Sequence, residues 1–169
     1  NDGYEQRRNL LHMQARCLVA LYRPVEARDT LITLTESEEG AKDVDAWIQL
    51  GHVAYVIKDQ ARLRTRASPA IALAPNRQEG YTLLALYQRN RGDLEGALSS
   101  LNKACEFRGS DTSPLVLKGL VARKLEQYAV ARQAFETASA EDPSNQNIQA
   151  LIASLPQETF ATVPDDGSN

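Results

Sequence analysis

Two histidines and two cysteines are the side chains in this sequence that most readily bind metals or take part in catalysis. His12 and His52 could approach each other if they lay on adjacent helices, with Asp45 nearby. Neither histidine has an HxxxH or HxxE partner, whereas zinc sites usually place some of their ligands at such short intervals. We therefore expect polar histidines rather than a metal site.

Cys17 and Cys105 lie far apart and form no CxxC motif. Each falls within an apolar helical pattern, which favours two buried thiols that pack as small hydrophobic side chains. A disulfide and a catalytic cysteine are the alternatives, but no suitable partner residue lies near either thiol in the sequence. Free thiols favour the cytoplasm, whereas a chain that starts at Asn1 without methionine leaves a processed secreted or periplasmic form open.

Motifs for catalysis and for nucleic-acid binding are also missing. The sequence has no glycine-rich phosphate loop, no GxSxG motif and no Cys/His pairing, so we expect neither an enzyme nor a cofactor. Arg62 and Arg66 share a helix face but lack interleaved aromatic residues, which indicates a solvated convex surface. The net charge of -3 disfavours nucleic acid as a partner, and no apolar run approaches the ~18 residues of a membrane span.

The helices that would carry these side chains recur at a fixed interval. With 169 residues, 43% hydrophobic and 24% charged, the chain suits one soluble domain or a short repeat array. Similar residues stand 34 positions apart in three pairs, Tyr81 and Leu115, Ala97 and Ala131, and Ala104 and Ala138. Trp47 precedes Tyr81 by the same interval, and a first unit near Leu11 is displaced by two extra residues within 38–43. A period of this length predicts stacked helical pairs.

This pattern resembles the tetratricopeptide repeat (TPR) family, whose 34-residue unit is a helical hairpin with small residues at its contact points. The last unit carries most of the family residues, namely Leu115, Gly119, Tyr128, Ala131, Phe135, Ala138 and Pro143. The resemblance implies an all-α, right-handed α-solenoid over residues 1–155. Its units would be about 8–41, 44–77, 78–111 and 112–145, with a capping helix at about 145–155 and a flexible tail over 156–169.

The unit 44–77 departs from the family pattern at two places. Leu63 and Ala67 reverse the usual order of a small and then a large residue. Pro69 falls inside the second helix, where it removes a backbone hydrogen bond. We expect a kink or an early break near 65–69. Elsewhere the local signals are regular, because Ser113 and Ser144 can cap helices and Gly92 can supply a turn.

The family's groove positions imply the surface on which a ligand would bind. They place in the groove His12, Arg16, Gln49, His52, Tyr55, Thr82, Leu86, Arg89, Asn90, Val116, Leu120, Arg123 and Lys124. The early half is polar, whereas the later half has Leu86, Val116 and Leu120, which belong either to the core or to the groove. If they face the groove, a peptide with apolar anchors and acidic residues would suit them.

A subgroup of the family binds chaperone C-termini through a clamp of lysine, asparagine and arginine, but these residues do not occur in either frame of this sequence. We therefore expect a non-catalytic scaffold that binds another protein or peptide by surface complementarity. One alternative is a self-assembling module in which a terminal helix face pairs with another copy to form a homo-oligomer. The other is a regulatory or anchoring segment of a larger multidomain protein.

Overall fold

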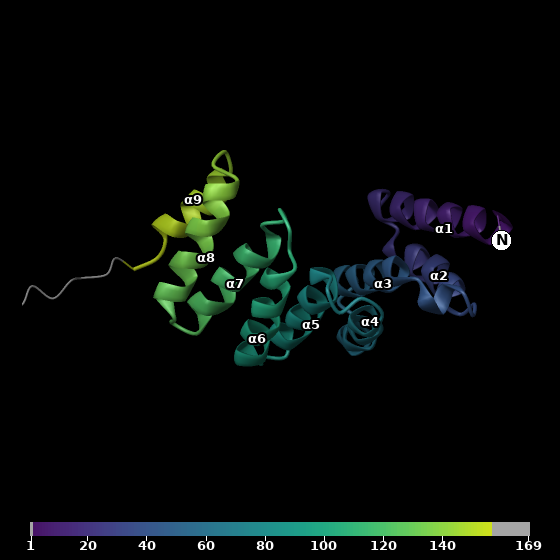
Figure 1. Ribbon diagram of the computed structural model, residues 1–169, viewed down its shortest axis with the longest axis horizontal. Helices are drawn as coiled ribbons and strands as arrows, with labels where there is room; N and C mark the ends of the chain where they lie inside the picture. The colour runs from purple at the N-terminus through teal and green to yellow at the C-terminus, as the bar shows by residue number, and fades with distance from the viewer. Residues whose placement is uncertain (1, 157–169) are drawn as a thin grey trace, which may run out of the picture.

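The computed structural model describes residues 2–156, and its regular elements in that range are all helices (Figure 1). They are α1 (Asp2–Ala20), α2 (Pro24–Thr35), the 3-10 helix η1 (Gly40–Lys42), α3 (Val44–Val56), α4 (Gln60–Leu73), α5 (Gln78–Asn90), α6 (Leu94–Glu106), α7 (Ser113–Lys124), α8 (Tyr128–Glu141) and α9 (Gln146–Ala153). Apart from Pro156, the tail that the sequence predicts over 156–169 lies outside the described residues.

The α-helices form an elongated array in chain order, with α1 at one end and α9 at the other (Figure 1). Each α-helix packs on the next, and α3 also contacts α5, as α5 contacts α7. The hydrophobic core is correspondingly divided into clusters along the array. Such an arrangement is the all-α solenoid that the repeat predicts, because a single helical pair cannot bury its own apolar face.

Glycines allow helices to approach closely at two equivalent positions. Gly51 of α3 faces the side chain of Leu83 in α5, and Gly119 of α7 faces the ring of Phe135 in α8. A Cβ at either glycine would overlap these side chains. Phe135 is fully buried, so its ring fills the space that the missing side chain of Gly119 leaves.

The turn within each helical pair has the same backbone geometry. Tyr22, Lys58, Gly92 and Glu126 all have positive φ, and they stand 36, 34 and 34 residues apart. The residue after each donates its N–H to a carbonyl five residues earlier, as in the bond from Asp93 to Gln88 of 2.9 Å. This is the Schellman arrangement that ends a helix with a left-handed residue. The turn predicted at Gly92 is therefore present.

Three local predictions differ from the structure. The early break expected near 65–69 is wrong, because α4 continues through Pro69 to Leu73. Pro69 lies four residues before the helix ends, so few hydrogen bonds follow the one that it removes. Ser113 is the first residue of α7 rather than its cap, and the residue before α9 is Asn145 rather than Ser144.

Replacement of Gly119 by alanine tests the close contact with Phe135. Alanine favours a helix over glycine by about 1 kcal/mol. We nevertheless expect Gly119→Ala to lower the free energy of unfolding by about 1–3 kcal/mol, because its Cβ overlaps the Phe135 ring. Urea denaturation measures the change, and Gly3→Ala is the control, since nothing lies near a Cβ at Gly3. The contact would be ruled out if adding Phe135→Leu rescued none of the loss.

The left-handed turns predict stabilising substitutions. We expect Lys58→Gly and Glu126→Gly each to raise the free energy of unfolding by up to about 1 kcal/mol. The reason is that the left-handed conformation strains a residue with a Cβ, while the backbone entropy of glycine offsets part of the gain. Gly92→Ala is the inverse control and should destabilise the protein in the same denaturation assay. A gain in stability from Gly92→Ala would contradict this account.

Candidate binding groove

The first helices of the successive pairs carry every residue that the sequence places in the groove. Their exposure varies widely. The exposed members are Arg16, His52, Tyr55, Asn90 and Lys124; the half-buried members are His12, Gln49, Thr82, Arg89, Val116, Leu120 and Arg123; Leu86 is buried. The predicted groove residues therefore do not form one uniform surface. Their contacts show which of them are available to a ligand and which are engaged within the protein.

A largely apolar cleft of about 350 Å³ lies between α1 and α3. Its apolar lining comes from the C-terminal halves of both helices and from α2, namely Ala15, Val19, Ala20, Leu31, Val53 and Val56. Three polar side chains of the predicted groove also line it, Arg16, Gln49 and His52. Arg16 makes no ion pair with any residue that the structure describes. The cleft thus combines apolar surface with an available positive charge.

A second cleft, of about 470 Å³, adjoins the first and shares Arg16 and Gln49 with it. It has a more polar lining that includes Arg8, Asn9 and Asp45. The two clefts together follow the line where α1 and α3 meet. An extended ligand lying along this line would meet apolar side chains at one end and charged groups at the other.

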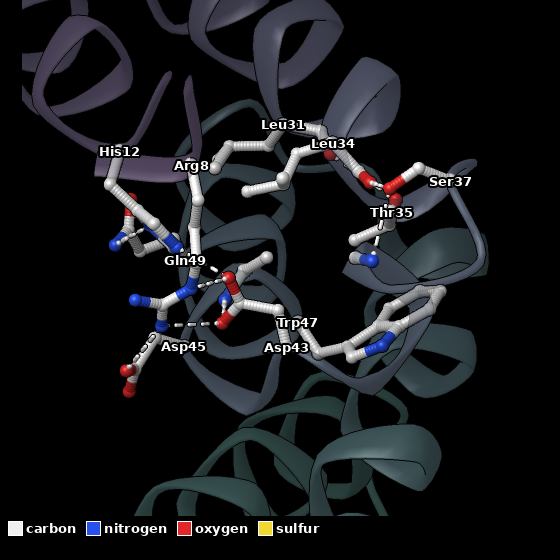
Figure 2. Close-up of polar contacts among 12 residues, drawn as sticks. Arg8, His12, Leu31, Leu34, Thr35, Ser37, Asp43, Asp45, Trp47 and Gln49 are labelled. Carbon is white, nitrogen blue, oxygen red and sulfur yellow. Dashed lines mark hydrogen bonds and ion pairs between the residues drawn. The ribbon is translucent and has the colours of Figure 1, made fainter. Parts of the chain in front are cut away.

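A buried carboxylate joins the N-terminal halves of α1 and α3 (Figure 2). The Asp43 side chain is only 2% exposed, and it accepts hydrogen bonds from Arg8 Nε at 2.6 Å and from the backbone N–H of Ala46. His12 Nε2 lies 2.8 Å from the same carboxylate, and Gln49 Nε2 lies 2.8 Å from His12 Nδ1. Because an amide nitrogen can only donate, Gln49 occupies Nδ1 as the donor and leaves the N–H at Nε2 to donate to Asp43.

The surroundings of Asp43 act on its pKa in opposite directions. Burial is the largest influence and raises the pKa, but the hydrogen bonds from Arg8, His12 and Ala46 together outweigh it. The net effect holds the pKa of Asp43 below its ordinary value, so the carboxylate stays ionised. His12 is therefore a structural residue, 12% exposed, whose ring nitrogens are both occupied.

Ion pairs continue from this cluster to the next helix. Arg8 also approaches Asp45, and Arg77 donates to Asp45 at 2.8 Å and to Glu79 at 2.7 Å. The hydrogen bonds from Arg77 are the main cause of the lowered pKa of Glu79. These pairs connect the N-terminal ends of α1, α3 and α5. They leave Arg16, one turn further along α1 from His12, outside the network.

His52 lies at the groove side of α3 and is exposed there. The surrounding helices nevertheless displace enough water to lower its pKa, and the Glu79 carboxylate opposes this effect. A lowered pKa favours the neutral imidazole, which can donate or accept a hydrogen bond at the edge of the apolar cleft.

The later half of the groove offers less apolar surface than the sequence indicates. Leu86 is 9% exposed and packs with Leu63 and Leu83 in the core, so the core alternative holds for this residue. Arg89 donates to the Tyr55 hydroxyl at 2.9 Å, and Arg123 donates to Ser154 of the segment after α9 at 3.1 Å. The polar groups there are therefore engaged with neighbouring helices, and the apolar cleft lies in the half that the sequence describes as polar.

Other predicted groups lie as follows. Asn90 at the end of α5 donates to Gln60 at the start of α4, and Thr82 donates within α5 to Gln78. Val116 and Leu120 are half-buried against the C-terminal core cluster. Lys124 is exposed at the end of α7.

The expectation of two buried thiols is wrong for Cys17. Cys17 is exposed, because no helix in the described structure covers the outer face of α1, whereas Cys105 is half-buried and its pKa is raised by burial. Within residues 2–156, no group of three or more His, Cys, Asp or Glu side chains is placed to hold a metal ion. None of the described helices has the length and apolar character needed to cross a membrane.

Sequence reasoning missed the residues that shape the clefts. Asp43 lies in the segment 38–43, which is predicted from the sequence to contain two extra residues between repeat units. An aspartate just before an apolar helical run is nevertheless a recognisable N-cap signal. Val19 and Val56 near the ends of α1 and α3 are missing from the predicted set, although their counterparts in the next unit, Tyr55 and Asn90, belong to it. Both valines line the apolar cleft.

No protein-family model matches the chain. Over 86 residues, 48% of this chain, it is 36% identical to tetratricopeptide repeat protein 36 of Xenopus tropicalis, and the match covers 43% of that relative. The structure is similar to that of TTC0263, a TPR protein of Thermus thermophilus, with a TM-score of 0.72, 22% identity and coverage of 87% of this chain and 79% of that one. It is also similar to the TPR protein YrrB, with a TM-score of 0.65, 17% identity and coverage of 83% and 71%.

The chain has the tetratricopeptide repeat fold. The resemblance stated from the sequence is thus confirmed, as is the all-α solenoid. The proteins named above are all described as TPR proteins. The surfaces of this TPR fold on which a partner could bind include the two clefts between α1 and α3.

Substitution of Asp43 tests the buried network. We expect Asp43→Asn to lower the free energy of unfolding at neutral pH by about 3 kcal/mol, because Arg8 loses its buried partner of opposite charge and His12 loses an ionised acceptor. Asp45→Asn is the control, and since Asp45 is half exposed it should cost less than about 1 kcal/mol.

The difference in unfolding free energy between the wild type and Asp43→Asn should depend on pH, because the pKa of Asp43 is lowered in the folded protein. The stabilisation is complete above the unfolded-state pKa of about 3.9 and is lost as the pH falls through the lower folded-state value. The stability gap between the wild type and Asp43→Asn should therefore narrow in acid, as urea denaturation at several pH values can measure. A gap that widened with acidification would contradict the assignment.

Proposed function

We propose that this TPR scaffold binds a peptide segment of a partner protein in its concave groove, with the cleft between α1 and α3 as the anchoring site. The proposal treats the helical pairs and α9 as one binding domain. The observation that supports it most is the combination, in one cleft, of an apolar lining and the uncompensated charge of Arg16.

The cleft has the features of a peptide anchor site. Its volume of about 350 Å³ lies at the lower end of the range of small-ligand pockets, which suits a short apolar segment. Burial of an aliphatic or aromatic side chain against Val19, Val53 and Val56 would supply most of the affinity. Polar groups at the edge would then fix the orientation of the peptide backbone.

Arg16 specifies the charge of the ligand. It borders both clefts, and its guanidinium has no carboxylate partner in the described structure. An Asp or Glu close to the apolar anchor of the peptide would pair with it, and the attraction would also speed association. His52 and Gln49 offer further hydrogen bonds on the same side. The structurally similar protein YrrB is described as a TPR protein with an unusual peptide-binding site, which supports a peptide ligand for a scaffold of this kind.

Selection from a random peptide library displayed on phage tests the proposal. We expect the wild-type chain to enrich peptides with an aliphatic or aromatic residue near an Asp or Glu. Arg16→Glu should abolish the preference for the acidic residue, because it reverses the charge at the cleft. Val56→Asp should reduce binding of the selected peptides at least tenfold, because it places a carboxylate in the apolar lining.

Matched controls lie on α4, away from the cleft. Arg64→Glu makes the same charge reversal at an exposed position, and Leu73→Asp introduces the same carboxylate on an exposed apolar residue. Both should bind the selected peptides as the wild type does, as fluorescence anisotropy can measure. The proposal fails if the library yields no enriched peptide, or if the α4 variants lose binding as strongly as the cleft variants.

A further inference from the structure

A third cleft continues the line of the two clefts between α1 and α3. Its volume is about 500 Å³. Its lining comes from the end of α3, the turn into α4 and the ends of α4 and α5 that meet there, namely Tyr55, Val56, Lys58, Gln60 and Asn90. Val56 also lines the apolar cleft, so the two spaces adjoin at this residue. The groove therefore extends past the apolar anchor site.

The order of the three clefts follows from the residues that they share. Arg16 and Gln49 line both the second cleft and the apolar cleft, whereas Val56 lines the apolar cleft and the third cleft. Gln49 and Val56 stand seven residues apart on α3, which corresponds to about 10 Å along the helix. The apolar cleft is thus bordered by Arg16 at one end and by the third cleft at the other.

Positive charge at the third cleft has no compensating carboxylate. Lys58 is exposed and Arg89 is half-buried, and neither forms an ion pair with any residue in the range 2–156. The described lining of the cleft contains no Asp or Glu. Asp59, which follows Lys58 in the chain, is engaged elsewhere, because it accepts from the backbone N–H of Arg62 and pairs with the Arg62 guanidinium at 2.9 Å. The charges of Lys58 and Arg89 are therefore available to a ligand.

Hydrogen bonds between α3, α4 and α5 hold the polar groups of this cleft in place. Arg89 Nη2 donates to the Tyr55 hydroxyl at 2.9 Å, which places the guanidinium beside the cleft lining. A guanidinium has five N–H donors, so this single bond leaves others free to bind a carboxylate. Asn90 Nδ2 donates to Gln60 Oε1 at 3.1 Å and joins the other two lining elements. The site is thus formed before any ligand binds.

Given the peptide-binding function proposed for the groove, we propose that the third cleft is its second anionic subsite, in which Lys58 and Arg89 bind an Asp or Glu of the ligand. The partner is then a linear protein segment with acidic residues on both sides of its apolar anchor. The first acid pairs with Arg16, and the second pairs with Lys58 and Arg89. An extended peptide advances about 3.3 Å per residue, so the 10 Å of the apolar cleft separates the two acids by about three to four residues.

The second subsite acts on specificity more than on affinity. Charge pairs at exposed positions contribute modestly, typically up to about fivefold in affinity, and salt weakens them. Cations at both ends of the apolar cleft also disfavour a ligand with Lys or Arg beside its anchor, because like charges would meet. The groove therefore distinguishes acidic apolar segments from basic ones.

A second library displayed on phage tests the subsite. It keeps the anchor and the first acid of a peptide selected by the wild-type chain, and it randomises the positions on the far side of the anchor. We expect enrichment of Asp or Glu about three to four residues from the first acid. Lys58→Glu should lose this preference and still select the anchor, because only the charge of the third cleft is reversed. Anchored peptides without a second acid would overturn this inference alone, whereas a first library without any enriched peptide would overturn the groove proposal as well.

Lys58→Gly supplies a measurement that misfolding does not explain, because glycine adopts the positive φ of this turn without strain. Fluorescence anisotropy should show about two- to fivefold weaker binding of the peptide with two acids. Binding of the same peptide with Asn or Gln in place of the second acid should be unchanged. Glu126→Gly is the matched control at the equivalent turn between α7 and α8, and it should bind both peptides as the wild type does. The inference is overturned if Lys58→Gly weakens both peptides equally or weakens neither.

Discussion

The close approach of helices at small residues is the constraint on which the rest of this solenoid depends. Gly51 and Gly119 admit Leu83 and Phe135 into positions that a Cβ would fill, and Ala15 and Ala85 are buried at the equivalent positions of the other units. Because one contact joins α3 to α5 and the other joins α7 to α8, small residues at this position bring helices together both between and within the helical pairs. Dispersion and apolar burial at these contacts stabilise the fold without a single central core.

The junction of α1 with α3 follows a different plan. Its N-terminal half is held by polar contacts, with Asp43 as the shared acceptor for Arg8 and His12. Its C-terminal half lacks such contacts and leaves the cleft lined by Val19, Val53 and Val56. A carboxylate that accepts charged hydrogen bonds tolerates burial only with its partners in place, which gives this junction a defined geometry on one side. The open side is where the chain has apolar surface available for a ligand.

The same helix presents two surfaces of different character. Toward α3 it offers Arg16 beside an apolar cleft, and on its outer face it carries the exposed side chains of Leu10 and Leu21.

The repeat by itself determined the fold of this protein. A 34-residue period with small residues at Ala97, Ala131 and Ala138 is compatible with few structures other than stacked helical hairpins, because local pattern and packing repeat together. Most of the helices, the turn at Gly92 and the absence of catalytic motifs were likewise readable from sequence. Only the tertiary structure decided that Leu86 belongs to the core, that His12 serves Asp43, and that the apolar cleft lies beside Arg16. These features depend on how far neighbouring helices separate and on which side chain reaches a buried carboxylate. Both are set by contacts between residues more than 30 positions apart, which no local sequence pattern encodes.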